Sequence, residues 1–100
     1  MRLITTRQLS CMEVINLCDG AKLGCPTDFE VDIDEGCIVA MLLPKDMGFL
    51  GFGKSEMYRI CWKSIQCIGE DTILIKLTSA ELTACLCRPT GPRKRGIGGR

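Results

Sequence analysis

The sequence predicts an all-β fold, a small barrel of about five to six mainly antiparallel strands. Two observations support this class. Apolar residues alternate with polar ones over several short segments, and residues that favour tight turns separate these segments. One hundred residues form one domain, in which we expect residues 1–80 to be the barrel and residues 81–100 a short helical turn with a flexible basic tail. Closure of the sheet protects edges that so small a domain would otherwise expose.

The first segment favours a helical turn, because residues 5–10 offer hydroxyl groups that suit a helix N-cap. We then expect a strand over residues 13–17, a hairpin turn at Asp19-Gly20 and extended chain over residues 22–25. Aspartate and glycine tolerate the positive φ angles of such turns. Pro26 cannot donate a backbone hydrogen bond, so it belongs at a sheet edge or a strand break.

The next predicted strand has a strict two-residue period. Phe29, Val31 and Ile33 share one face, which predicts a half-buried strand with these three side chains toward the core. Carboxylates alternate with them and continue into the following turn (Glu30, Asp32, Asp34 and Glu35). The group lacks the oxygen-ligand pattern of an EF-hand loop, so we interpret it as a solvated face and not as a calcium site.

Residues 37–43 are apolar on both faces, which predicts a central strand that is covered on both sides. The turn at Glu35-Gly36 precedes this strand, and Pro44 ends it. Both features fit a strand in the middle of an antiparallel sheet.

The second half of the chain predicts two further strands and a helix. In chain order we expect a strand over residues 57–62, an apolar connector over 65–68, a turn at 69–71, a strand over 72–77 and a helix over 80–86. Tyr58, Ile60 and Trp62 share one face of the first of these strands, and we expect Trp62 to pack in the core. Thr78 and Ser79 suit the N-cap of the helix.

A glycine-rich segment, residues 45–55, connects the central strand to the next one. Such a segment invites a phosphate-binding interpretation, but no helix plainly follows it, so we interpret it as a hairpin loop. Large apolar residues at a loop tip suit contact with another protein. Phe49, Leu50 and Phe52 are therefore the predicted partner-binding residues.

Charge is unevenly distributed along the chain. Of the 13 basic residues, five lie in residues 88–100, which contain none of the 12 acidic residues. A mildly acidic body with a basic tail results, and we expect the tail to be disordered. Such a tail either stays solvated or holds phosphate, and in the second case Arg93, Lys94 and Arg95 are the predicted nucleic-acid contacts.

Eight cysteines are many for this length. No pair has C-x-x-C spacing and the chain has no histidine, so the sequence predicts no metal site. We expect reduced thiols, with Cys37, Cys61 and Cys67 in the core as small hydrophobic residues. A cysteine-based redox or metal-binding role is an alternative, above all for Cys85 and Cys87 beside the basic tail.

The composition also bears on location. No apolar run approaches the ~20 residues of a membrane helix, and residues 1–14 lack the continuous apolar core of a signal peptide. The hydrophobic content of 46% is ordinary for a globular domain. We therefore expect a cytoplasmic protein without membrane insertion.

Four segments carry a family resemblance: LSCMEVINLCDGAKLG, DFEVDIDEGCIVAMLLP, GFLGFGKSEMYRICW and IGEDTILIKL. In order and spacing they resemble the PRC-barrel family, most closely the sporulation-associated YlmC/YmxH-like proteins, over residues 9–77. The chain departs from that pattern at Cys61, where members commonly have proline, and at Cys11, which replaces a glycine. The resemblance implies a PRC-type β-barrel that serves as a docking surface in a spore-forming bacterium.

Together these observations predict a non-enzymatic module for protein–protein interaction or scaffolding. The lack of histidine removes the commonest general base, and we predict no catalytic residue and no cofactor. The partner is an unidentified protein, and we also expect a homo-oligomer. The alternative to an interaction module is an RNA- or ribosome-associated factor that binds nucleic acid through the basic tail.

Overall fold

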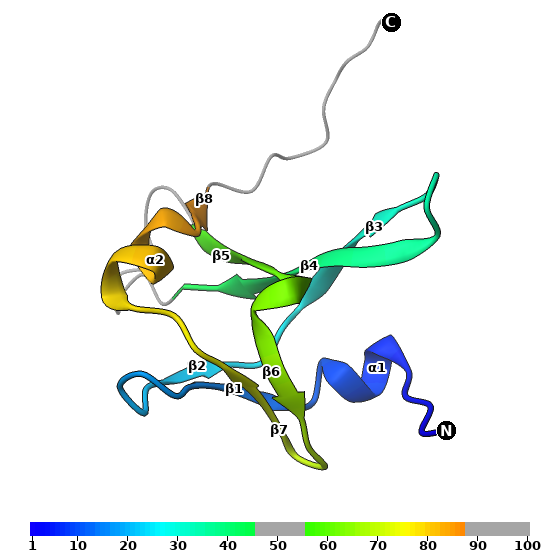
Figure 1. Ribbon diagram of the computed structural model, residues 1–100, viewed down its shortest axis with the longest axis horizontal. Helices are drawn as coiled ribbons and strands as arrows, with labels where there is room; N and C mark the ends of the chain where they lie inside the picture. Colours follow the sequence, from blue (N-terminus) through cyan, green and yellow to red (C-terminus); the bar gives the residue numbers. More distant parts are fainter. Residues whose placement is uncertain (46–55, 88–100) are drawn as a thin grey trace, which may run out of the picture.

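The computed structural model describes residues 1–45 and 56–87, which form two four-stranded sheets and three short helices (Figure 1). The first sheet has the strand order β2, β1, β7, β6 (Lys22–Gly24, Glu13–Asn16, Thr72–Ile75 and Ile65–Ile68). The second sheet has the order β3, β4, β5, β8 (Asp28–Asp32, Cys37–Pro44, Met57–Cys61 and Leu86–Cys87). The helices are α1, the 3₁₀ helix η1 and α2 (Thr6–Leu9, Trp62–Ser64 and Ser79–Ala84). The all-β class is confirmed, and no closure of the two sheets into one hydrogen-bonded barrel is detected among these residues.

The first sheet combines antiparallel and parallel pairing. β1 and β2 form the predicted hairpin, in which Gly20 has φ +73° and its N–H donates to the carbonyl of Asn16 at 2.7 Å. β1 also pairs in parallel with β7, with Val14 opposite Ile73. Ile65–Ile68 is the edge strand β6 and not the predicted connector, because it pairs with β7.

The second sheet is an antiparallel meander of β3, β4 and β5, to which β8 adds a short fourth strand. β4 is central, as predicted from its apolar residues. Gly36 has φ +73° in the turn before it, which confirms the turn at Glu35-Gly36. β8 was not predicted, because two residues are too few to show a pattern.

The prediction that Val31 and Ile33 face the core is wrong. The ladder of β3 and β4 skips Val39 of β4 between the pairs Glu30–Ala40 and Val31–Ile38, and β5 pairs with β4 only from Ala40 onward, so no third strand covers the hairpin beyond this bulge. Phe29, before the bulge, packs against the core as predicted. Val31 and Ile33 are instead 55% and 87% exposed.

The chain crosses between the sheets three times. Pro26 is fully buried on the way from β2 to β3, which confirms its place at a strand break. Trp62 opens η1 between β5 and β6, and its ring meets that of Phe29 edge to face at 6.4 Å. α2 makes the third crossing, and its capping box joins Thr78 to Glu81 as the cap residues predict.

The core between the sheets is aliphatic. Its fully or nearly fully buried side chains come from α1, both sheets and the segment after β7 (Leu9, Met12, Val14, Met41, Leu43, Ile60, Ile73, Ile75 and Leu77). The prediction that Cys37, Cys61 and Cys67 lie in the core is wrong, since all three are exposed. Ile60 points inward, and Cys61, the next residue of β5, therefore faces outward.

Asn16 is the one fully buried polar side chain among the described residues. Its amide nitrogen donates to the carbonyl of Leu77 at 2.9 Å, and its Oδ1 accepts the N–H of Leu77 at 3.0 Å. Asn16 therefore continues the β1–β7 ladder with its side chain, two residues beyond the end of β7. This pairing fixes the chain where it leaves the first sheet for α2.

We predict that Asn16→Ala lowers the free energy of unfolding by about 2–4 kcal/mol, because both backbone groups of Leu77 lose their buried partner. Gln66→Ala, which removes an exposed amide from β6, is the matched control and should change it by about 0.5 kcal/mol or less. Urea denaturation of both variants measures the difference. Equal losses would show that the Asn16 amide does not hold this crossing.

Candidate interaction surface

The residues predicted from sequence as contact sites lie outside the described part of the chain: Phe49, Leu50 and Phe52 in the loop, and Arg93, Lys94 and Arg95 in the tail. The described residues nevertheless locate where these segments begin. Lys45 donates its N–H to the carbonyl of Glu56 at 2.9 Å, which joins the two ends of the loop. Cys87, the last residue before the tail, pairs with Met57, which follows Glu56 in the chain. Both segments therefore begin at the same corner of the second sheet.

The loop also contains the letters of a phosphate-binding motif, since residues 48–55 read GFLGFGKS and fit G-x-x-x-x-G-K-[ST]. In a P-loop this motif joins a strand to a helix whose N-terminus faces the phosphate. Here the loop joins β4 to β5, two antiparallel neighbours. The structural context that the motif requires is absent from the described residues on either side.

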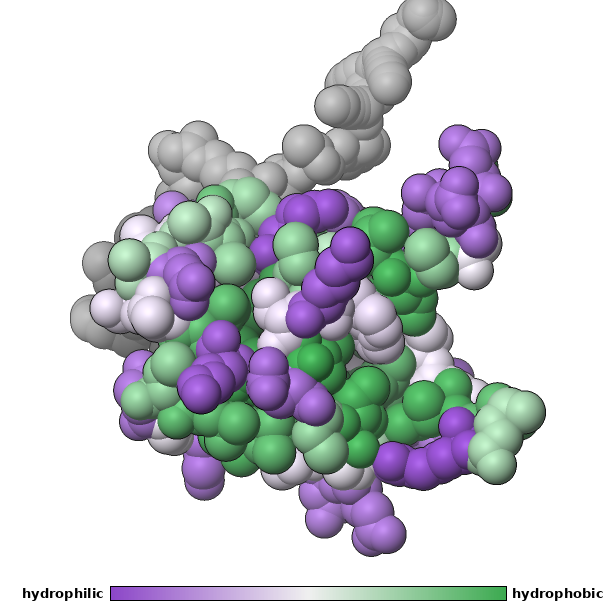
Figure 2. All heavy atoms as spheres, in the orientation of Figure 1, coloured by the Kyte–Doolittle hydropathy of each residue, from purple (hydrophilic) through white to green (hydrophobic). Residues whose placement is uncertain are grey.

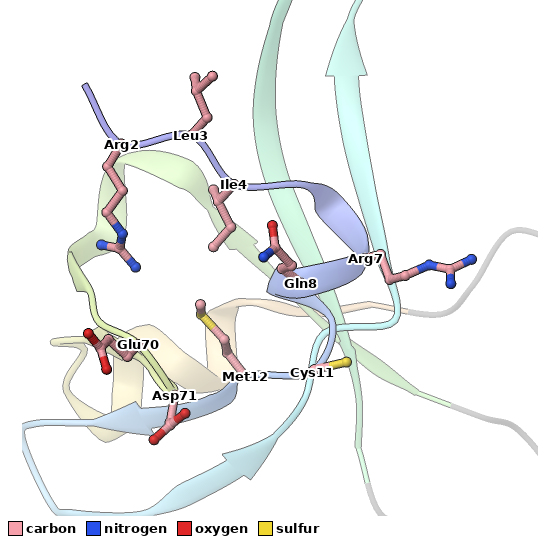
Figure 3. A pocket seen from close by; sticks show the side chains of 9 residues that line it. All are labelled: Arg2, Leu3, Ile4, Arg7, Gln8, Cys11, Met12, Glu70 and Asp71. Carbon is pink, nitrogen blue, oxygen red and sulfur yellow. The ribbon is translucent and has the colours of Figure 1, made fainter.

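A depression of about 460 Å³ lies between the N-terminal segment, α1 and the β6–β7 turn (Figure 3). Ile4 and Met12 face each other across it, while Arg7 and Cys11 point away. Hydrophobic residues gather on this side of the molecule in Figure 2. The polar side chain of Arg2 is engaged in the fold: its guanidinium donates to the carbonyls of Ile68 at 3.0 Å and Gly69 at 2.6 Å.

The remaining polar groups of this depression do not form a catalytic arrangement. Gln8 is the partner of Thr5 in the capping box of α1, with its Oε1 2.8 Å from the N–H of Thr5. Glu70 and Asp71 are exposed on the turn. Ile4 and Met12 line the depression with apolar atoms, and the guanidinium of Arg2 donates to backbone carbonyls and is not available to an anion. The depression is a seam where the N-terminal segment docks on the first sheet.

A second open depression, of about 680 Å³, lies where the edge of the first sheet meets the loop end of the second (Glu13, Lys22, Leu23, Gly24, Pro44, Lys45 and Tyr58). It combines two lysines, one carboxylate and a phenol. It borders the residue at which the described chain stops before the loop.

The third feature is the hairpin end, which we define as residues 31–39, the part of the β3–β4 hairpin beyond β5. β5 pairs with β4 only from Ala40 to Pro44, so the hairpin end has two strands and no third neighbour. It extends away from the body in Figure 1, and its tip shows mainly hydrophilic residues in Figure 2. Val31 and Ile33 are exposed there for lack of a covering strand.

Carboxylates surround these two aliphatic side chains. Glu30 is paired with Arg59 of β5, with Nε and Oε1 2.6 Å apart, and this hydrogen bond raises the pKa of the guanidinium. Both partners are about two-fifths exposed, so the pair adds little stability. Asp32 accepts the N–H groups of Asp34 and Glu35 at 2.9 and 3.1 Å, which shapes the turn. Asp34 and Glu35 point their charge at solvent.

Six of the eight thiols are exposed, and Cys85 and Cys87 are half-buried. The backbone N–H of Arg59 donates to the carbonyl of Cys85 at 2.8 Å, which places Cys85 beside β5. Burial raises the pKa of the Cys85 thiol, Cys61 acts in the same direction, and Arg59 opposes them. The described residues contain no group of three or more histidine, cysteine, aspartate or glutamate side chains that could hold a metal ion.

Comparison with known proteins places the chain in a family. It is 36% identical over 77 residues to the "probable sporulation protein YlmC" of Bacillus subtilis, a match that covers 76% of this chain and 95% of that relative. The chain belongs to the YlmC family. A second relative, an uncharacterized protein of Clostridium acetobutylicum, is 36% identical over 67 residues, which cover 67% of this chain and 77% of the relative. No family model matches the chain.

The YlmC-like resemblance inferred from the four sequence segments is thus confirmed, while the wider assignment to PRC-barrels stays a prediction. In the described part of this YlmC-family chain, no helix is long and apolar enough to cross a membrane. Sequence reasoning missed the hairpin end as a surface. Its alternation of acidic and apolar residues is the pattern of a half-buried strand. Nothing in the sequence marks the register shift or the point beyond which β5 no longer pairs with β4.

We predict that Val31→Thr changes the free energy of unfolding by about 0.5 kcal/mol or less, because the side chain is mostly in water already. Val14→Thr is the matched control: it places the same hydroxyl in the core of this YlmC-family protein and should cost about 2 kcal/mol. Thermal or urea denaturation compares the two. A loss at Val31 as large as that at Val14 would return Val31 to the core face that strict alternation predicted.

The raised pKa of Cys85 predicts slow alkylation. Iodoacetamide reacts with thiolates, so Cys85 should be modified more slowly than the exposed Cys61 at the same pH. Timed labelling followed by peptide mass spectrometry gives both rates. The pKa of the Cys85 thiol is higher in the folded state than in the unfolded state. Its contribution to stability is therefore complete at a pH below the ordinary thiol pKa of 9.0 and is lost as the pH rises through the folded pKa.

The matching control is Cys85→Ala, which should remove that part of the alkaline loss of stability. Equal alkylation rates for Cys85 and Cys61 in the folded protein would contradict the burial of Cys85.

Proposed function

We propose that this protein is a non-enzymatic module for protein–protein interaction, that it acts in sporulation, and that its two-sheet body serves as a scaffold for the hairpin end. The observation that carries the proposal is the exposure of Val31 and Ile33 on a two-stranded projection without a third strand. A small domain that leaves aliphatic side chains on a projection has a surface suited to a partner. The name of the Bacillus relative supports the link to sporulation.

The sheet edges support contact through side chains and not through strand addition. β2 has three residues and β8 has two, so neither offers a long ladder. β6 is interrupted by a register shift, and Arg2 occupies carbonyls at its end. β3 carries carboxylates, and a register shift interrupts its ladder with β4. Such features discourage pairing with a foreign strand, which leaves the side chains of the hairpin end as the contact surface.

We also propose a cytoplasmic location and kinship to the PRC-barrels, on the sequence features given above. The loop residues Phe49, Leu50 and Phe52 form a second proposed contact surface. The loop begins and ends at the corner opposite the hairpin end along β4, so the two surfaces can be tested separately.

We predict that the double variant Val31→Thr, Ile33→Thr fails to retain a protein that the unmodified chain captures from sporulating cells of its host, because the apolar contact is lost. Leu17→Thr is the matched control, since Leu17 is also exposed and aliphatic but lies beyond β1 on the other sheet. Quantitative mass spectrometry of captured proteins gives the ratio. The variant Phe49→Ser, Leu50→Ser, Phe52→Ser tests the loop in the same assay.

The same variants, placed in the host, should lower the count of heat-resistant spores in proportion to the lost capture. Unchanged capture and unchanged spore counts with both the hairpin and the loop variants would reject the interaction module. Unchanged spore counts after deletion of the whole gene would reject the role in sporulation.

A further inference from the structure

The hairpin end combines exposed aliphatic side chains with exposed carboxylates. Two exposed aliphatic side chains, Val31 and Ile33, lie beside the exposed carboxylates of Asp34 and Glu35. A partner must therefore supply positive charge next to an aliphatic group.

The hairpin has no positive charge of its own. Residues 23–44 contain five carboxylates and neither lysine nor arginine. Arg59 of β5 neutralises only Glu30 at the base of the hairpin. Two copies of this hairpin repel each other, so a symmetrical contact between hairpin ends is unfavourable. The occupant is a basic segment.

The chain itself contains such a segment. Residues 88–100 carry five positive side chains and no acidic one, with three of them consecutive at Arg93–Arg95. Ile97 follows this cluster by two residues, so the segment also has an aliphatic side chain close to its charges. The positive charges of the tail therefore match the carboxylates of the hairpin in sign and number, and Ile97 supplies an aliphatic group to meet Val31 and Ile33.

The tail of the same copy is poorly placed to reach the hairpin end. Cys87 pairs with Met57, which pairs with Pro44, so the tail starts at the end of β4 that is remote from the turn. Figure 1 shows β8 and the turn at opposite ends of the second sheet. The eight residues of β4 span about 25 Å, and three strand spacings of about 4.8 Å separate β8 from β3.

Lys94 is seven residues beyond Cys87, a stretch that reaches about 25 Å when it is fully extended. Contact within one copy thus requires a straight, fully ordered tail. Effective concentration falls towards zero when a linker barely spans its two sites. A tail from another copy orders only the residues that make contact.

We propose that the basic tail, residues 88–100, of one copy binds the hairpin end of a second copy. Arg93–Arg95 pair with the carboxylates of Asp34 and Glu35, and Ile97 packs beside Val31 and Ile33. The proposal rests on the proposed function and names one partner of the same surface, a second copy of this chain. Each copy carries a tail at one end of the sheet and a hairpin end at the other, so the contact is head to tail or reciprocal between two copies.

The experiment uses a zero-length carbodiimide cross-linker, which joins a lysine amine to a carboxylate in direct contact. Full-length chains, half of them labelled with ¹⁵N, are mixed, cross-linked and digested, and linked peptides are identified by mass spectrometry. Lys94 is the one lysine of the tail, so its linked carboxylate identifies the docking site. We expect links from Lys94 to Asp34 or Glu35, with labelled and unlabelled peptides joined in the mixed pairs that contact between copies gives.

Two full-length variants separate contact from chemistry. Lys94→Arg removes the reactive amine but keeps the charge, so the cross-link disappears while self-association measured by analytical ultracentrifugation persists. The charge reversal Arg93→Glu, Lys94→Glu, Arg95→Glu should weaken self-association by about tenfold or more, because like charges then face each other. Raising sodium chloride from about 0.05 M to about 0.5 M should weaken the contact of the unmodified chain in the same direction.

Three results would overturn the proposal: links from Lys94 that join only peptides of the same label, links to carboxylates outside the hairpin, or self-association that the charge reversal leaves unchanged. None of these outcomes touches the proposed function. Capture of a foreign partner that depends on Val31 and Ile33 but not on the tail charges would sustain the interaction module and reject the second copy as its occupant.

Discussion

The pairing of the Asn16 side chain with the backbone of Leu77 is the constraint on which the rest of this fold depends. The chain leaves β7 two residues before Leu77, and it must turn there to reach the second sheet through α2. A buried amide that satisfies both an N–H and a carbonyl holds this departure in one geometry. α2 then places Leu86–Cys87 against β5, which brings Cys85 beside Arg59 and locates the start of the tail. The position at which the tail begins follows from that crossing.

Local rules explain the parts of the fold that could be predicted from the sequence. Glycine at positive φ marks the turns at Gly20 and Gly36, and hydroxyl residues with a polar partner three residues later mark the starts of the two α-helices, at Thr5 and Thr78. The apolar run before Pro44 correctly indicated the central strand β4. Each of these signals lies within a few residues and needs no knowledge of distant partners.

Other features depend on how distant segments pair, and the sequence does not encode this locally. The parallel ladder of β1 and β7 and the buried role of Asn16 appear only when both ends of the body meet. β5 ends opposite Ala40, so the face of Val31 that alternation assigns to the core is left uncovered and becomes the candidate surface. The exposure of Cys61 follows from alternation along β5, since Cys61 adjoins the inward-facing Ile60. The candidate site was therefore found from structure, while the loop and tail remain sequence predictions.

The aliphatic core provides stability, and the proposed contact surface lies apart from it on the hairpin end. The β1–β7 ladder has a consequence for how that core comes into being. β1 is synthesised well before its parallel partner, which is complete only once residue 75 has left the ribosome. Until then Val14 and Ile15 lack the strand that pairs with them, so the first sheet stays incomplete while the second sheet is being synthesised. In such a domain the pairing of β1 with β7 is a contact that forms late.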